Sequence, residues 1–151
     1  MRRRSLSTGL IWLGALGLVV IVAAGPALAQ KKFLEKVRRH YQLGLATGKC
    51  ALCHELKDKE DPHRNNLNAY GKEIQLSEAM KPLLGKDDEY KFTDDELATL
   101  MKIVQGIEDK DSDSDGATNK EELELGTFPG DKESKPEAAK LEKYRKDHPK
   151  K

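Results

Sequence analysis

The sequence predicts an all-α fold, and three observations lead to this prediction. In two segments apolar residues recur every three or four positions, which places them on one face of a helix. A capping box, in which a Thr and a Glu three residues later bind each other's backbone N–H groups, begins the second segment. No segment alternates apolar and polar residues in the way of a half-buried strand. The 151 residues suffice for one small domain with tails.

The first predicted helix lies within residues 31–45. Apolar residues recur there at intervals of three and four, namely Leu34, Val37, Tyr41 and Leu45. This spacing predicts a single buried stripe along the helix. Gly44 and Gly48 then loosen the chain just before Cys50.

A loop and a second helix are predicted next. Residues 57–66 are polar and contain Pro62, which indicates a loop. Residues 68–80 fit a second helix that Pro82 ends, because proline cannot continue helical hydrogen bonding. Residues 81–92 then form a connector.

The last core helix has the clearest signal. Thr93 and Glu96 form the capping box. Five apolar residues follow on one face: Leu97, Leu100, Met101, Val104 and Ile107. We therefore expect this helix to pack firmly against the core. Beyond Gly126, many charges and prolines predict a mobile tail, with at most a frayed helix near residues 138–146.

The first 29 residues have the layout of a secretory signal peptide. Three arginines follow Met1, residues 10–24 are apolar, and small residues allow cleavage after Ala29. An uncleaved membrane anchor is the alternative, although the apolar run is shorter than the about 18 residues that a spanning helix needs. We expect a periplasmic or otherwise exported protein, with membrane association only if this segment is retained.

The charge balance argues against nucleic acid as a partner. Three of the 27 basic residues and none of the 26 acidic residues lie in residues 1–29, so the chain without them has 24 basic and 26 acidic residues and a formal charge of −2. A nearly neutral protein lacks the strong positive field that nucleic acid attracts.

Cys50-Ala-Leu-Cys53-His54 is the most specific motif of the sequence. On one helical turn the two sulfurs can form thioethers with the vinyl groups of a haem, and the adjacent His54 can supply the proximal bond to iron. A thioredoxin-like site, half of a zinc site and a simple disulfide are the alternatives. They are less favoured because the chain has no strand pattern and no second Cys pair, and because a disulfide does not explain the adjacent His.

The distal iron ligand is left open by the sequence. Met80 lies 26 residues after His54, in the segment before the last core helix, and is our tentative distal ligand. Met101 falls on the apolar stripe and suits core packing better. His40 and His63 would give bis-His ligation, and an open site is a further alternative.

The acidic stretch 111–122, called the acidic loop below, matches a calcium-binding loop. Oxygen-bearing or backbone ligands are predicted at six positions: Asp111, Asp113, Asp115, Ala117 through its carbonyl, Asn119 and Glu122. Gly116 permits the sharp turn that such a loop needs. The alternative is a solvated acidic loop. A structural calcium site is favoured over a switch, because Gly126 and Pro129 shorten any exiting helix.

Two segments resemble known families. Cys50-Ala-Leu-Cys-His54 followed by Arg64-Asn-Asn-Leu-Asn-Ala-Tyr70-Gly71 resembles haem-attaching domains of exported bacterial proteins. Residues 111–129 resemble the calcium loops of bacterial thrombospondin type 3-like repeats. The order of helix, haem motif, Met and amphipathic helix is also similar to small class I cytochromes c, although the interval from His54 to Met80 is short and Lys-Pro follows Met80. Arg64, Asn68 and Tyr70 either bind haem propionates or form the polar start of a helix.

These features together predict the organisation and the function. We expect a signal peptide (1–29), a cytochrome c-like helical domain around one haem c (30–108), a calcium loop (109–130) and a charged flexible tail (131–151). The predicted function is electron transfer with an unidentified redox partner protein, because no catalytic constellation accompanies the motif. The alternatives are a haem enzyme or sensor with an open distal site, and a haem-free calcium-binding interaction module with a Cys50–Cys53 disulfide.

Overall fold

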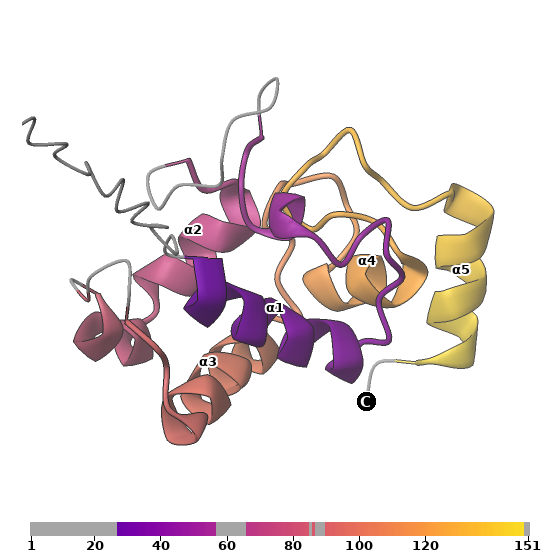
Figure 1. The fold of residues 1–151 in the computed structure, drawn as a ribbon. Helices are drawn as coiled ribbons and strands as arrows, with labels where there is room; N and C mark the ends of the chain where they lie inside the picture. The colour runs from indigo at the N-terminus through magenta and orange to yellow at the C-terminus, as the bar shows by residue number, and fades with distance from the viewer. Residues whose placement is uncertain (1–26, 57–65, 85, 87–89, 150–151) are drawn as a thin grey trace, which may run out of the picture.

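The computed structural model describes residues 27–56, 66–84, 86 and 90–149. These residues form helices and no strand, so the all-α prediction is confirmed for them (Figure 1). The elements in chain order are α1 (Ala27–His40), η1 (Cys50–Leu52), α2 (Ala69–Leu76), η2 (Glu78–Leu83), α3 (Asp94–Gly106), α4 (Asn119–Leu125) and α5 (Ala138–Asp147), where η marks a 3₁₀ helix. Most of the predicted signal peptide, residues 1–26, and the candidate ligand His63 lie outside the described residues. None of the described helices has the length and apolarity needed to cross a membrane.

The first two helices end earlier than the spacing predicts. Helix α1 stops at His40, and Gln42 adopts a positive φ of 52°. Leu45 is therefore 83% exposed instead of buried, and Leu43 enters the core in its place. Helix α2 stops at Leu76, because Ser77 is extended, and Pro82 lies inside η2 rather than ending α2.

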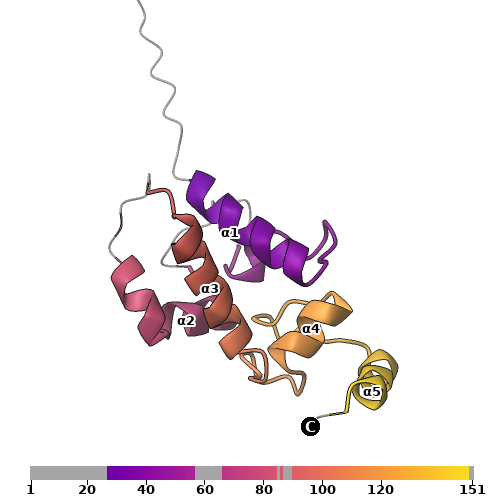
Figure 2. The same ribbon diagram turned by 90° about the horizontal axis from the view of Figure 1, so that it is seen from below.

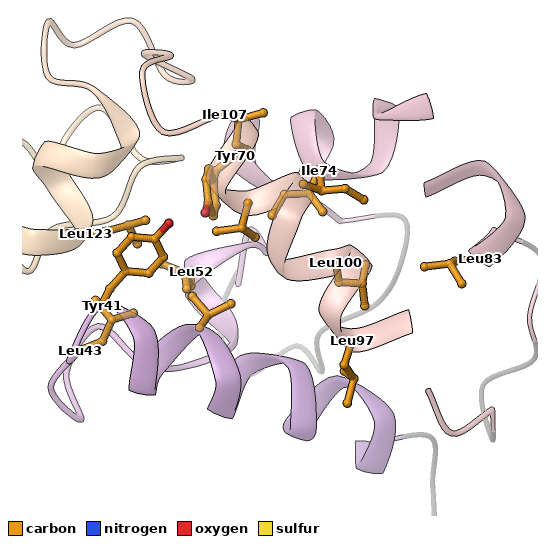
Figure 3. Packing of buried hydrophobic residues seen from close by; sticks show 13 residues of the cluster. Tyr41, Leu43, Leu52, Tyr70, Ile74, Leu83, Leu97, Leu100, Ile107 and Leu123 are labelled. Atoms are coloured by element: carbon orange, nitrogen blue, oxygen red, sulfur yellow. The ribbon is translucent and has the colours of Figure 1, made fainter. Parts of the chain in front are cut away.

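One hydrophobic core joins the segments on both sides of the predicted boundary at residue 108. Helices α1 and α3 contact each other, as do α2 and η2 (Figure 2). Leu123 of α4 belongs to the same buried cluster as Leu52 and Leu100 (Figure 3). Phe128 packs against this cluster. The residues that directly follow the acidic loop therefore belong to the same core as the helices before it.

The predicted flexible tail contains an ordered helix. Helix α5 lies beside α4, and its Leu141 is buried (Figure 1). Arg145 Nε is 2.7 Å from Glu121 Oε1, and the Tyr144 hydroxyl donates to Glu124 at 2.6 Å. The sequence analysis allowed at most a frayed helix near residues 138–146, and the structure has a helix there that bonds to α4, about twenty residues away in the sequence.

Candidate functional site

Residues 50–54, called the cysteine turn below, form one compact turn. The backbone N–H groups of Cys53 and His54 both donate to the carbonyl of Cys50 at 3.1 Å. Cys50 is exposed, Cys53 is half-buried against the core, and the structure gives both as free thiols. Burial, with a smaller contribution from Cys50, raises the pKa of the Cys53 thiol to about 12, so Cys53 is uncharged at neutral pH.

The side chain of Asn68 fastens the cysteine turn to the start of α2. Its Nδ2 donates to the carbonyls of Ala51 and Leu52, both at 3.1 Å. Its Oδ1 accepts from the N–H of Gly71 at 2.9 Å, which makes Asn68 the N-cap of α2. Its own N–H donates to the Cys53 carbonyl at 3.0 Å. Asn68 is only 3% exposed, so these bonds replace contacts with water.

Gly71 and Tyr70 lie where α2 meets the cysteine turn and the core. A methyl group on Gly71 would overlap the backbone oxygen of Cys53, so glycine allows α2 to approach the cysteine turn. Tyr70 is buried, and its hydroxyl has no hydrogen-bond partner among the described residues. Figure 3 shows this hydroxyl pointing toward that of Tyr41. Asn68 is thus the polar start of a helix, as one of the two interpretations held, while Arg64 lies outside the described residues.

We expect Asn68→Ala to lower the free energy of unfolding by about 2–4 kcal/mol, because it removes a helix cap and leaves buried carbonyls without donors. Thr93→Ala is the matched control, since Thr93 caps α3 through an exposed bond to Glu96 and its loss should cost only about 1 kcal/mol. Urea unfolding of the two variants, followed by circular dichroism, measures the difference. Equal costs would contradict a fastening role for Asn68.

The candidate iron ligands occupy different surroundings. His54 is half-buried, and its Nδ1 lies 3.2 Å from Asn66 Oδ1. Met80 in η2 and Met101 in α3 both pack against the core. His40, at the exposed end of α1, has its Nε2 3.3 Å from Gln105 Nε2.

The acidic loop brings three predicted calcium ligands together. Carboxylate oxygens of Asp111, Asp113 and Asp115 lie within 4.8 Å of one another. The Asp111 carboxylate also accepts from the backbone N–H of Gly116 at 2.8 Å. Gly116 has a φ of 96°, which the turn requires and which glycine adopts without strain.

Glu122 comes from α4 and is fully buried, with 0% exposure. Its Oε1 accepts from the Thr127 hydroxyl at 3.3 Å, while its Oε2 has no hydrogen-bond partner among the described residues. Burial, followed by the charges of Asp113 and Asp115, raises the pKa of Glu122 to about 9. Buried oxygens of Asp113 and Asp115 likewise lack partners in this part of the chain. A cation would satisfy this set of buried oxygens, so the residues present fit a hard divalent ion.

Two predicted ligands of the loop have other contacts. Asn119 Oδ1 accepts from the N–H of Ser112 at 3.2 Å, and its Nδ2 donates to the carbonyl of Ile107 at 2.7 Å. This amide therefore joins the two ends of the acidic loop. Ala117 is fully buried and donates its N–H to Asp115 Oδ1 at 2.7 Å.

Two cations that the sequence analysis missed cover the acidic loop from the C-terminal side. Lys135 donates to the carbonyl of Asp115, and Arg145 donates to the carbonyl of Gly116 at 2.8 Å. Arg145 also bonds Glu121 and lowers its pKa. No local pattern marks these two residues, because both reach the loop across more than fifteen residues of sequence.

Comparisons with known proteins found no matching family model, no matching curated protein and no matching solved structure.

Proposed function

We propose that this chain is an exported mono-haem c-type cytochrome that transfers electrons and holds a structural calcium ion. The observation that supports this most is the cysteine turn itself. Cys50 and Cys53 lie three residues apart on one turn, and Asn68 bonds the Ala51 and Leu52 carbonyls. The two thiols and the imidazole of His54 thus stand on one turn, with the spacing that two thioethers and a proximal bond to iron require.

Each residue of the motif has a separate task in this proposal. The Cys50 and Cys53 thiols would hold the haem through thioether bonds to its two vinyl groups. A bond from His54 Nδ1–H to Asn66 Oδ1, 3.2 Å away, would leave Nε2 as the nitrogen that binds iron. The bound haem supplies one-electron chemistry, and the protein sets the potential and the access of the redox partner.

The ligand at the distal side of the iron distinguishes an electron carrier from a haem enzyme or sensor. Met80 is the proposed distal ligand, and a thioether there raises the reduction potential. The proposal includes a cytochrome c-like arrangement in which the helices α1 and α3 flank the motif and Met80 in the chain. An open distal position would instead favour a haem enzyme or gas sensor.

The test is expression of the full chain in a bacterium equipped for haem c maturation. The expected product has a c-type pyridine haemochrome spectrum and the mass of residues 30–151 plus one haem. Low-spin spectra that carbon monoxide does not change support the electron carrier, whereas a large change supports the open site. A haem-free product two hydrogens lighter than the reduced chain would refute the proposal and leave a disulfide-bearing calcium module.

The calcium ion in this proposal is held by the carboxylates of Asp111, Asp113, Asp115 and Glu122, together with the carbonyl of Ala117 and the side chain of Asn119. It would neutralise clustered carboxylates and connect the end of α3 to α4. Isothermal titration of the chain with Ca²⁺ should show one site, with much weaker binding of Mg²⁺, because the smaller ion requires a tighter octahedral shell.

A further inference from the structure

The segment that follows α4, residues 127–130, lies between the acidic loop and the cysteine turn. Thr127, at the start of this segment, is bonded to Glu122. Its N–H donates to the Glu122 carbonyl at 2.9 Å, and its hydroxyl donates to Glu122 Oε1 at 3.3 Å. Phe128 packs against the core, and the Lys49 ammonium lies 5.7 Å from the centre of its ring. Pro129 is fully buried. Segment 127–130 is thus held along its whole length.

Gly130 ends this segment against the side chain of Asn68. A methyl group on Gly130 would overlap the Asn68 amide, whose nitrogen would lie only 2.7 Å away. The same amide donates to the carbonyls of Ala51 and Leu52 in the cysteine turn. A short series of contacts therefore runs from Glu122 through Thr127 and Gly130 to Asn68 and the cysteine turn.

Helix α4 itself is anchored, so a change at Glu122 is not absorbed by a shift of the helix. Glu108, at the end of α3, accepts from the Tyr41 hydroxyl at 2.6 Å and from the Lys120 ammonium at 3.0 Å. Leu123 is buried in the core. An ion that binds the Glu122 carboxylate through its unpartnered Oε2 fixes the position of Oε1, which accepts from the Thr127 hydroxyl, so its effect passes into segment 127–130.

We infer that calcium at the acidic loop positions the cysteine turn, with Gly130 and Asn68 as the positioning residues. The ion fixes Glu122 and Thr127, and Gly130 then holds the Asn68 amide against the carbonyls of the turn. This inference rests on the proposed calcium site and is independent of whether haem is attached.

The test measures alkylation of each thiol in the reduced, haem-free full chain, with and without saturating Ca²⁺. Cys50→Ser and Cys53→Ser variants each leave one thiol to follow. Calcium should slow alkylation of the half-buried Cys53 about fivefold or more, the lower end of typical coupling between sites. The exposed Cys50 serves as the internal control, and its rate should not change.

Gly130→Ala should abolish the effect of calcium on Cys53 while Ca²⁺ still binds and still raises the melting temperature. Gly106→Ala is the matched control, because nothing lies within 4 Å of a methyl group at that position, and it should keep the effect. Thr127→Val removes the hydroxyl bond to Glu122 and leaves Gly130 in place. It should weaken the effect of calcium on Cys53 alkylation.

Two results would overturn this inference in distinguishable ways. Calcium binding with no change at Cys53 refutes the coupling alone. Absence of calcium binding refutes the coupling together with the proposed calcium site, while the haemochrome experiment decides the haem separately.

Discussion

The Cys50→Ser/Cys53→Ser double variant should leave the purified chain with no covalently bound haem. Serine hydroxyls keep the size and spacing of the thiols but do not form thioethers, so nothing retains the cofactor in denaturant. Haem staining of a denaturing gel and the pyridine haemochrome spectrum measure the loss. Each single variant should keep at most one thioether, with a haemochrome maximum displaced from that of the parent chain.

Ala51→Ser is the matched control for this prediction. It changes a residue inside the cysteine turn without touching either thiol or His54, and it should keep the parent amount of haem. A double variant that retained haem at the parent level would refute attachment through these cysteines. Loss of haem in the control as well would show that the cysteine turn tolerates no substitution. The single variants would then decide whether haem is attached through Cys50 and Cys53.

Glu122→Gln should weaken calcium binding about 100-fold or more. The substitution removes one negative charge and one of the oxygens expected to bind the ion, and even residues behind the metal ligands often contribute 10–100-fold. Isothermal titration of the purified full chain measures the constant. Glu124→Gln is the matched control: Glu124 lies two residues away on the exposed side of α4, where it accepts from the Tyr144 hydroxyl, and its change should leave affinity within about threefold.

The same carboxyl should make calcium affinity depend on pH. Without an ion, the folded chain retains the Glu122 proton up to a pKa of about 9, whereas the unfolded chain ionises near 4.5. The neutral carboxyl therefore favours the ion-free fold fully below about pH 4.5, and this contribution is lost as the pH rises toward about 9. Because Ca²⁺ needs the ionised form, its affinity should rise about tenfold per pH unit between about pH 6 and 8 and level off above about pH 9.

Proton release measured in buffers of different ionisation enthalpy provides the check. The parent chain should release close to one proton per Ca²⁺ at neutral pH, and Glu122→Gln should release fewer. An affinity that does not change over this pH range would contradict binding of the ion by Glu122.

Local sequence predicted the features that depend on neighbouring residues. The capping box of Thr93 and Glu96 is present in full, because its two hydrogen bonds close within three residues. The three aspartates of the acidic loop meet because alternate loop positions and Gly116 bend the backbone around one point. Apolar spacing likewise predicted α1 and α3, although it did not predict where α1 ends.

Helix ends and long-range contacts depended on packing that no short window contains. Leu45 continues the apolar spacing of α1, but the helix ends at His40, before Leu45 is reached. Leu43 is therefore buried in the core and Leu45 is exposed. Charge-rich composition predicted a mobile tail, yet Arg145 finds Glu121 on α4. Composition indicates only the average polarity of the C-terminal segment. The position of α5 depends on one buried residue, Leu141, and on the ion pair that Arg145 forms with α4.

The sequence by itself determined the all-α class, the capping box, the cysteine motif and the grouping of the loop aspartates. The tertiary structure alone decided that Asn68 braces the cysteine turn, that Gly130 rests on Asn68, and that Glu122 is buried with an unpartnered oxygen. The physical reason is range: hydrogen bonds within one turn depend on a few adjacent residues, whereas burial depends on which distant segments the core brings together.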